Sequence, residues 1–94
     1  MFNVLIEPAG TVTFSGRLDT TQAPRALELL QPLKGTVTVN LAALEYISSA
    51  GLGVLIATHN RLKASGGALI ILNPTQHVRH ILSLACLDKV LTIR

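Results

Sequence analysis

Tryptophan is absent from this chain of 94 residues, and its only aromatic residues are Phe2, Phe14 and Tyr46. Proteins that bind single-stranded nucleic acid stack bases on aromatic side chains and track the backbone with clustered basic residues. The eight lysine and arginine residues, which contribute to a formal net charge of +3, are scattered along this chain. We therefore expect no direct binding of nucleic acid.

Cysteine and long apolar runs are equally scarce. Cys86 is the single cysteine, so no internal disulfide can form, which is typical of a reducing compartment. The longest apolar run, Ala68 to Leu72, is far shorter than the roughly 18 residues that a membrane span requires. The N-terminus also lacks the basic and apolar regions of a signal peptide. These absences predict a soluble, cytoplasmic protein without membrane insertion.

Apolar residues are abundant instead. Hydrophobic residues make up 49% of the sequence and charged residues only 14%, where about a quarter is usual for charged residues. A chain of 94 residues is long enough for one hydrophobic core and too short for two. We expect a single domain over residues 1–94, with much of it buried or part of its apolar surface kept for a partner.

Three stretches alternate apolar and polar residues with the period of a β-strand. Two of them flank Pro8-Ala9-Gly10, whose composition favours a turn. The run Ala68 to Leu72 is uniformly apolar, as expected of an interior strand that is covered on both faces. The predicted strands are residues 3–7, 11–15, 36–40, 68–72 and 90–93.

Three other stretches have the apolar spacing of helices. The first follows candidate N-caps at residues 19–21 and ends near Pro32 and Gly35, the second covers residues 50–65, and Asn73 with Pro74 caps the third. The expected core faces are Ala26, Leu27, Leu29 and Leu30 in the first helix, Leu52, Leu55, Ile56, His59 and Leu62 in the second, and Val78, Ile81, Leu82 and Ala85 in the third.

The order of these elements is ββαβαβαβ. Strands that are joined through helices are normally parallel and need helices to cover them, whereas the opening pair is joined by a short turn. The sequence therefore predicts an α/β fold, with a mixed β-sheet packed with about three α-helices.

The segment Tyr46 to Gly53, YISSAGLG, lies where a predicted strand passes into the second helix. Either Ser48 or Ser49 is placed to act as N-cap, with its hydroxyl among backbone N–H groups that lack helical partners. A phosphate on such a hydroxyl would face the positive end of the helix dipole. Gly51 and Gly53 each cost about 1 kcal/mol against alanine in a helix. Close approach by a partner is one explanation, and a capped helix with a small-residue packing face is the other.

Hydrolase motifs are incomplete around these serines. Ile47 stands where the first glycine of Gly-x-Ser-x-Gly is needed, and no lysine lies three residues after a serine. His59 is ten positions after Ser49 on the same predicted helix, which is about 15 Å. This distance excludes a hydrogen-bonded nucleophile and base, so we expect no enzyme activity.

Metal and cofactor sites are also not expected. His77 and His80 have the spacing of two metal ligands, but only Cys86 lies near enough in the sequence to be a third. We interpret the two histidines as flanking the apolar face of a surface helix, and His59 as a partly buried, hydrogen-bonded side chain.

YISSAGLGVL, the strand ALIILN, Pro74 and VRHILSLACLDKVLTI together resemble the STAS domain family, and specifically the bacterial anti-sigma factor antagonists. SGRLD, at residues 15–19, is similar to the Gly-x-Leu-Asp segment of that family. The resemblance implies a binding switch. Such proteins bind a serine kinase that doubles as an anti-sigma factor, phosphorylation of a serine at the start of the second helix breaks the complex, and a PP2C-type phosphatase restores it.

The resemblance also implies which residues act. Ser49 matches the phosphorylated serine of the pattern Asp-Ser-(Ser/Thr)-Gly-Leu-Gly, and Asp19 matches an acidic residue near it. Two positions depart from the pattern, because Ser48 replaces the aspartate and Ala50 replaces the second hydroxyl residue, and the first departure makes Ser48 a rival acceptor. The expected partner-binding residues are Asp19, Ser48, Ser49, Ala50, Gly51, Leu52, Gly53 and, on an exposed side of the second helix, Val54, Thr58 and Arg61.

Two functions stay open. One is the phosphorylation-switched antagonist, acting as a monomer or weak dimer. The other is a STAS module that is not phosphorylated and serves as a scaffold or small-molecule-binding subunit, for example of a lipid transport or signalling complex.

Overall fold

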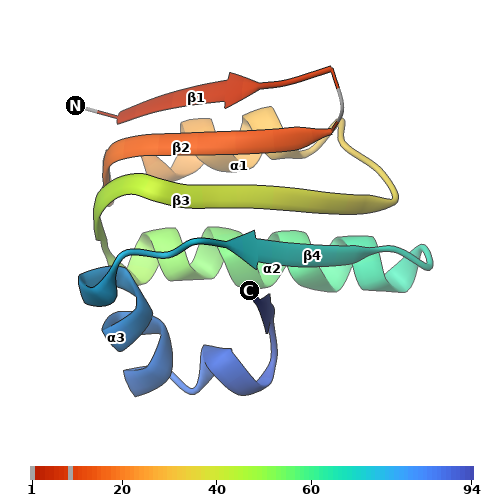
Figure 1. Cartoon of the computed structure of the whole chain (residues 1–94). Coiled ribbons are helices and arrows are strands. Elements are labelled where there is room, and N and C mark those ends of the chain that lie inside the picture. Colours follow the sequence, from red (N-terminus) through yellow and green to blue (C-terminus); the bar gives the residue numbers. More distant parts are fainter. Residues whose placement is uncertain (1, 9) are drawn as a thin grey trace.

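The computed structural model describes residues 2–8 and 10–94 and contains one five-stranded sheet with helices joining its parallel strands (Figure 1). Its elements are β1 (Phe2–Ile6), β2 (Thr11–Leu18), α1 (Ala23–Leu30), β3 (Thr36–Ile47), α2 (Ser49–Ala64), β4 (Ala68–Leu72), α3 (Gln76–Leu84), a short 3₁₀ helix η1 (Leu87–Lys89) and β5 (Thr92–Ile93). The predicted α/β class and element order are confirmed.

The strands lie side by side in the order β1-β2-β3-β4-β5, which is also their order in the chain. β1 pairs with β2 antiparallel, and β2, β3, β4 and β5 pair parallel to one another. The sheet is therefore mixed, as predicted. Because every parallel crossover steps in the same direction and such crossovers are right-handed, the three helices belong to one face of the sheet.

Figure 1 shows α1 and α2 together behind the sheet. Residues that point to this face form the core, among them Phe14, Val39 and Ile71, none of which is exposed to solvent. The opposite face is only half covered, since Ala68, Ile70 and Leu72 are of intermediate exposure. The expectation that β4 is covered on both faces is wrong, because no crossover places a helix on the second face.

Several predicted boundaries shift where hydrogen bonds outside the local pattern decide them. β3 continues from residue 40 to Ile47, because β2 extends alongside it through two irregularities in the pairing. Thr75, and not Asn73 with Pro74, caps α3, since its side-chain oxygen accepts a hydrogen bond from the Val78 N–H. The last strand contains only Thr92 and Ile93.

Candidate functional site

Ser48 ends the extended chain of β3 and begins α2. It has an extended backbone, and its hydroxyl oxygen accepts a hydrogen bond of 3.2 Å from the Gly51 N–H. Its own N–H donates to the carbonyl oxygen of Leu18 at the end of β2. Ser48 is therefore the N-cap of α2 and is half-buried, so its hydroxyl is already used in the fold.

Ser49 is the first residue of α2 and differs from its neighbour in exposure. Its side chain is open to solvent and takes no part in the capping hydrogen bond, which Ser48 makes. The first turn of a helix offers backbone N–H groups without helical partners and the positive end of the helix dipole. No acidic residue lies in the first turn of α2. A phosphate on Ser49 would meet favourable partial charges there.

The two glycines of this turn have different surroundings. A Cβ atom on Gly51 would lie 2.7 Å from Ile47 Cγ1 and 3.0 Å from the Leu18 carbonyl oxygen. Gly51 is thus needed for close packing of α2 on the ends of β2 and β3. A Cβ atom on Gly53 would meet nothing within 4 Å, and Gly53 is exposed. Packing within the domain requires a glycine at position 51. It does not require one at position 53, where the exposed backbone is open to contact with a partner.

Asp19 lies directly after β2, at the same end of the sheet as Ser48. The hydrogen bond from the Ser48 N–H to the Leu18 oxygen brings these two segments together. The Asp19 carboxylate accepts a hydrogen bond of 3.1 Å from the Gln22 N–H, and its backbone oxygen accepts from Gln22 and Ala23. Asp19 is half-buried and shapes the entry to α1. The residue before it, Leu18, is hydrogen-bonded to the start of α2.

Three residues expected on an exposed side of α2 face inward instead. Val54 is 5% exposed and Thr58 1% exposed, so both belong to the buried side. Arg61 is half-buried, and its guanidinium donates hydrogen bonds of 2.8 Å to the Leu30 oxygen and 2.9 Å to the Leu33 oxygen. The expectation of an exposed Val54, Thr58 and Arg61 surface is wrong, because α1 packs against this side of α2.

The expected core face of α2 is rotated for the same reason. The buried residues are Gly51, Val54, Leu55, Thr58 and Leu62, while Leu52, Ile56 and His59 are only half-buried. Nδ1 of His59 and the hydroxyl of Thr58 are buried without a hydrogen-bond partner. The expected hydrogen bond of His59 is therefore not present at that nitrogen.

An apolar groove between α1 and α2 was not predicted from the sequence. It has a volume of about 420 Å³ and runs beside the first turns of both helices. The signal for it is a set of small residues on facing helix sides, which leave space where larger side chains would meet. Its lining residues are Thr20, Ala23, Pro24, Leu27, Ala50, Gly53 and Val54.

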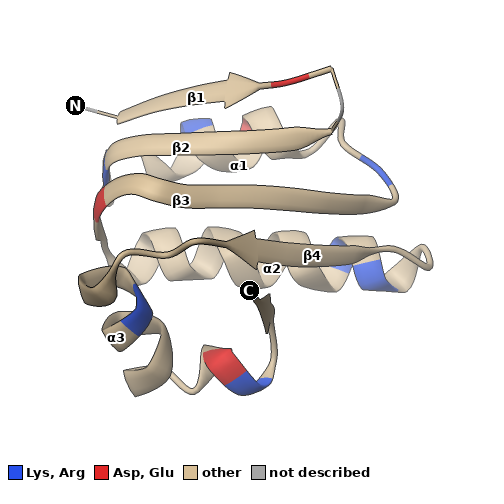
Figure 2. Cartoon of the chain, in the orientation of Figure 1, with Lys and Arg blue, Asp and Glu red and all other residues tan. Residues whose placement is uncertain are grey.

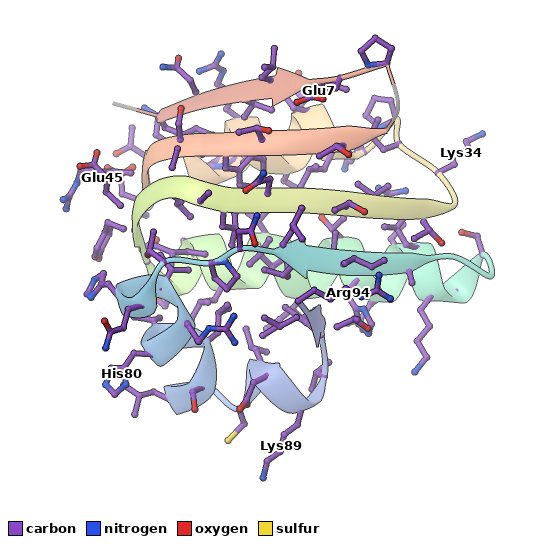
Figure 3. All side chains as sticks on the ribbon, viewed as in Figure 1. Glu7, Lys34, Glu45, His80, Lys89 and Arg94 are labelled. Atoms are coloured by element: carbon purple, nitrogen blue, oxygen red, sulfur yellow. The ribbon has the colours of Figure 1, made fainter. Side chains whose placement is uncertain are left out.

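Arg17 and Tyr46 also lie at this end of the sheet. They are register partners in β2 and β3, and the Arg17 guanidinium carbon is 4.5 Å from the centre of the Tyr46 ring. This is a cation–π contact, which depends on strand register and so cannot be read from sequence spacing. Figure 3 shows Glu45 pointing away from the sheet at the same end. The start of α2 is thus flanked by exposed groups of both charges.

Charged residues elsewhere are distributed over several elements. Figure 2 shows basic and acidic segments spread over the helices and loops. His77 and His80 line a shallow depression at the start of α3, and His80 points away from the molecule (Figure 3). Within residues 2–8 and 10–94, no three histidine, cysteine or acidic residues are grouped as ligands for a metal ion. No helix in this part of the chain is long and apolar enough to cross a membrane.

Comparisons with known proteins identify the family of this chain. Residues 4–94 match the family model of the STAS domain. The anti-sigma-B factor antagonist of Bacillus subtilis (strain 168) is 28% identical over 85 residues, which cover 87% of this chain and 78% of that protein.

Solved structures share the fold over nearly the whole chain. An anti-sigma factor antagonist from Mycobacterium paratuberculosis superposes with a TM-score of 0.87 at 25% identity, covering 99% of this chain and 85% of that one. The Bacillus cell fate determinant SpoIIAA in its phosphorylated form gives a TM-score of 0.72 at 22% identity, covering 100% of this chain and 91% of that one. Since the family model matches all but the first three residues, the chain belongs to the STAS domain family.

Proposed function

We propose that this protein is an anti-sigma factor antagonist that binds a serine kinase acting as an anti-sigma factor, and that phosphorylation of Ser49 releases it. Its membership in the STAS family and its similarity to the anti-sigma-B factor antagonist support the general role. The observation that carries the switch is the exposure of Ser49 on the first turn of α2, next to a serine that is already engaged as the cap.

Ser49 is favoured over Ser48 as the acceptor for a physical reason. Phosphorylation of Ser48 would place a bulky dianion on the oxygen that accepts from the Gly51 N–H, at a half-buried position. Phosphorylation of Ser49 leaves that cap in place and adds the dianion at the favourable end of the helix dipole. The domain can then stay folded while the surface that it offers to a partner changes.

The proposed partner surface is centred on the exposed part of the first turn of α2. It comprises Ser49, Ala50, Leu52 and Gly53, with Asp19 and Ser48 beside them. The apolar groove borders this surface through Ala50 and Gly53. A phosphate of about −1.5 to −2 charges placed in a close-packed interface adds desolvation and repulsion. A change of about 3 kcal/mol weakens binding by more than a hundredfold.

The role of a binding protein rather than an enzyme is supported by the placement of the candidate catalytic groups. Ser49 and His59 are separated along α2 by about 15 Å, which is too far for a nucleophile and its base. In the proposed cycle the partner enzymes catalyse both reactions. A kinase transfers the phosphate to Ser49, and a PP2C-type phosphatase removes it, in the cytoplasm.

The test is intact mass after incubation with the purified partner kinase and Mg-ATP. We expect the wild type to gain one phosphate, about 80 Da, and Ser49→Ala to gain none. Ser48→Ala is the matched control, because it removes the neighbouring hydroxyl and should still be modified. Loss of the phosphate in Ser48→Ala alone would move the acceptor to Ser48, and no gain in any protein despite complex formation would contradict the switch.

A second candidate function is that of a STAS module that binds an apolar small molecule and is not phosphorylated. The apolar groove between α1 and α2 is the observation that favours it. Ala50→Trp would fill this groove from the exposed helical turn. Binding of an aliphatic probe such as dodecanoate, measured by calorimetry in the wild type and absent in Ala50→Trp, would support this alternative if the mass experiment fails.

A further inference from the structure

The two edges of the sheet differ in length. β5 forms one edge with only Thr92 and Ile93, and β1 forms the other with five residues, Phe2–Ile6. Figure 1 shows β1 as the outermost strand on the side away from β4. A long edge strand presents a row of unpaired backbone groups, to which another strand can bind.

β1 lacks the features with which proteins usually block such an edge. Charged residues, proline and β-bulges are the common devices. The strand sequence FNVLI contains neither charge nor proline, and its pairing with β2 runs without a shift from Phe2 to Ile6. The residues of β1 therefore do not themselves block its outer edge.

The register identifies which backbone groups point outward. The Glu7 N–H donates a hydrogen bond of 2.9 Å to the Thr11 oxygen at the start of the hairpin. Hydrogen-bonded and non-hydrogen-bonded pairs alternate along an antiparallel ladder. Asn3 and Leu5 therefore point their N–H and C=O groups toward β2, and those of Phe2, Val4 and Ile6 point away from the sheet.

Two apolar side chains of β1 are also exposed to solvent. Leu5 is 61% exposed and Ile6 is 43% exposed, two of the four large hydrophobic residues that are exposed in the described part of the chain. An edge with outward backbone groups and exposed apolar side chains is typical of a strand that pairs with another.

We propose that β1 pairs antiparallel with β1 of a second copy of this chain, around a two-fold axis through Val4. In this register Val4 lies opposite Val4 of the second copy, and Phe2 lies opposite Ile6. Each outward N–H then meets an outward C=O, and every pair at an outward position is apolar. The two copies form one continuous sheet with their helices on the same side.

A second copy is a better match to this strand than a charged peptide. The strand FNVLI is uncharged, so pairing two copies of it brings no like charges together at the contact. Its outward positions Phe2, Val4 and Ile6 are apolar. The contact is short, which places it among weak interfaces of small area. We expect a dimer that forms near about 100 µM and dissociates near about 1 µM. The axis lies at β1, two strands away from β3 and the start of α2, so Ser49 stays accessible.

Sedimentation analysis over this concentration range tests the proposal. The wild type should rise toward twice the 10.0 kDa mass of one chain. Leu5→Lys places a charge one residue from the two-fold axis on each edge, so that the contact holds two like charges, and should remain monomeric, with far-UV circular dichroism confirming its fold. Leu84→Lys is the matched control, because Leu84 is 72% exposed at the end of α3 and lies outside the proposed contact. This control should dimerise like the wild type.

Amide hydrogen exchange locates the contact. The N–H groups of Val4 and Ile6 should exchange at least about tenfold more slowly at high than at low protein concentration, because the dimer covers them. A wild type that stays monomeric at 500 µM or more overturns the proposal. A dimer that persists unchanged in Leu5→Lys, or one that leaves the exchange of Val4 and Ile6 unaltered, overturns it as well.

Discussion

The Ser48 N–H donates a hydrogen bond of 2.9 Å to the carbonyl oxygen of Leu18. This bond joins the start of α2 to the end of β2, and Asp19 follows Leu18 directly. The first turn of α2 therefore has a fixed position relative to the entry of α1. An anchor of this kind orders the backbone of the surface around Ser49 before binding, and such preorganisation lowers the entropy cost of binding a partner.

Removal of the Ser48 hydroxyl should change the stability of the domain, and removal of the Ser49 hydroxyl should change its phosphorylation. Ser48→Ala removes the N-cap and should lower the free energy of unfolding by about 1 kcal/mol, while it keeps the acceptor Ser49. Ser49→Ala should leave the stability nearly unchanged and abolish phosphorylation. Urea denaturation and intact mass measure the two effects. Equal stability of both variants would contradict the capping role of Ser48.

The two glycines of α2 should respond in opposite directions to alanine. Gly51→Ala brings a Cβ atom to 2.7 Å from Ile47 Cγ1, and we expect the free energy of unfolding to fall by about 1–3 kcal/mol. Gly53→Ala meets nothing within 4 Å and should raise it by up to about 1 kcal/mol. Urea denaturation checks both values. Weaker partner binding by the stabilised Gly53→Ala variant would indicate that the partner approaches this position closely.

Thr58→Val should stabilise the protein. The Thr58 hydroxyl is buried without a hydrogen-bond partner, and valine has nearly the same shape without the polar atom. An unsatisfied buried group costs about 1–3 kcal/mol. We therefore expect a gain of about 1 kcal/mol, or a rise in Tm of about 4–8 °C for a domain of this size. A lower Tm measured by calorimetry would show that the hydroxyl is satisfied in solution.

Arg61 should matter for stability through α1 rather than through a partner. Its guanidinium donates to the oxygen of Leu30, the last residue of α1, and to that of Leu33 in the following loop. The last turn of α1 has no basic residue of its own. Arg61→Ala should lower the free energy of unfolding by about 1–3 kcal/mol. Arg61→Lys should recover only part of this loss, because an ammonium group does not provide the same planar fork. Thermal denaturation compares the three proteins, and full recovery in Arg61→Lys would show that charge alone is sufficient.

Local sequence signals predicted the element types and the start of α2. Alternation marked β1, β2 and the first part of β3, and the hydroxyl residues before an apolar helical segment indicated a cap at residues 48–49. These signals are reliable because side-chain period and capping depend on neighbours along the chain. The choice between Ser48 and Ser49 as cap stayed open, since both carry the same hydroxyl and only the backbone angles at residue 48 decide it.

The sequence by itself thus determined a mixed α/β domain and placed two serines at a helix start. The tertiary structure decided which side of α2 is buried. Apolar residues occur around much of this helix, so a stripe through Leu52 and one through Val54 both have helical spacing, and only the packing of α1 buries Val54. It also decided that Gly51 is required for packing, that Arg61 donates to the Leu30 oxygen at the end of α1, and that a groove is lined by Ala50 and Gly53. These features depend on contacts between segments that are distant in the chain, which local periodicity does not encode.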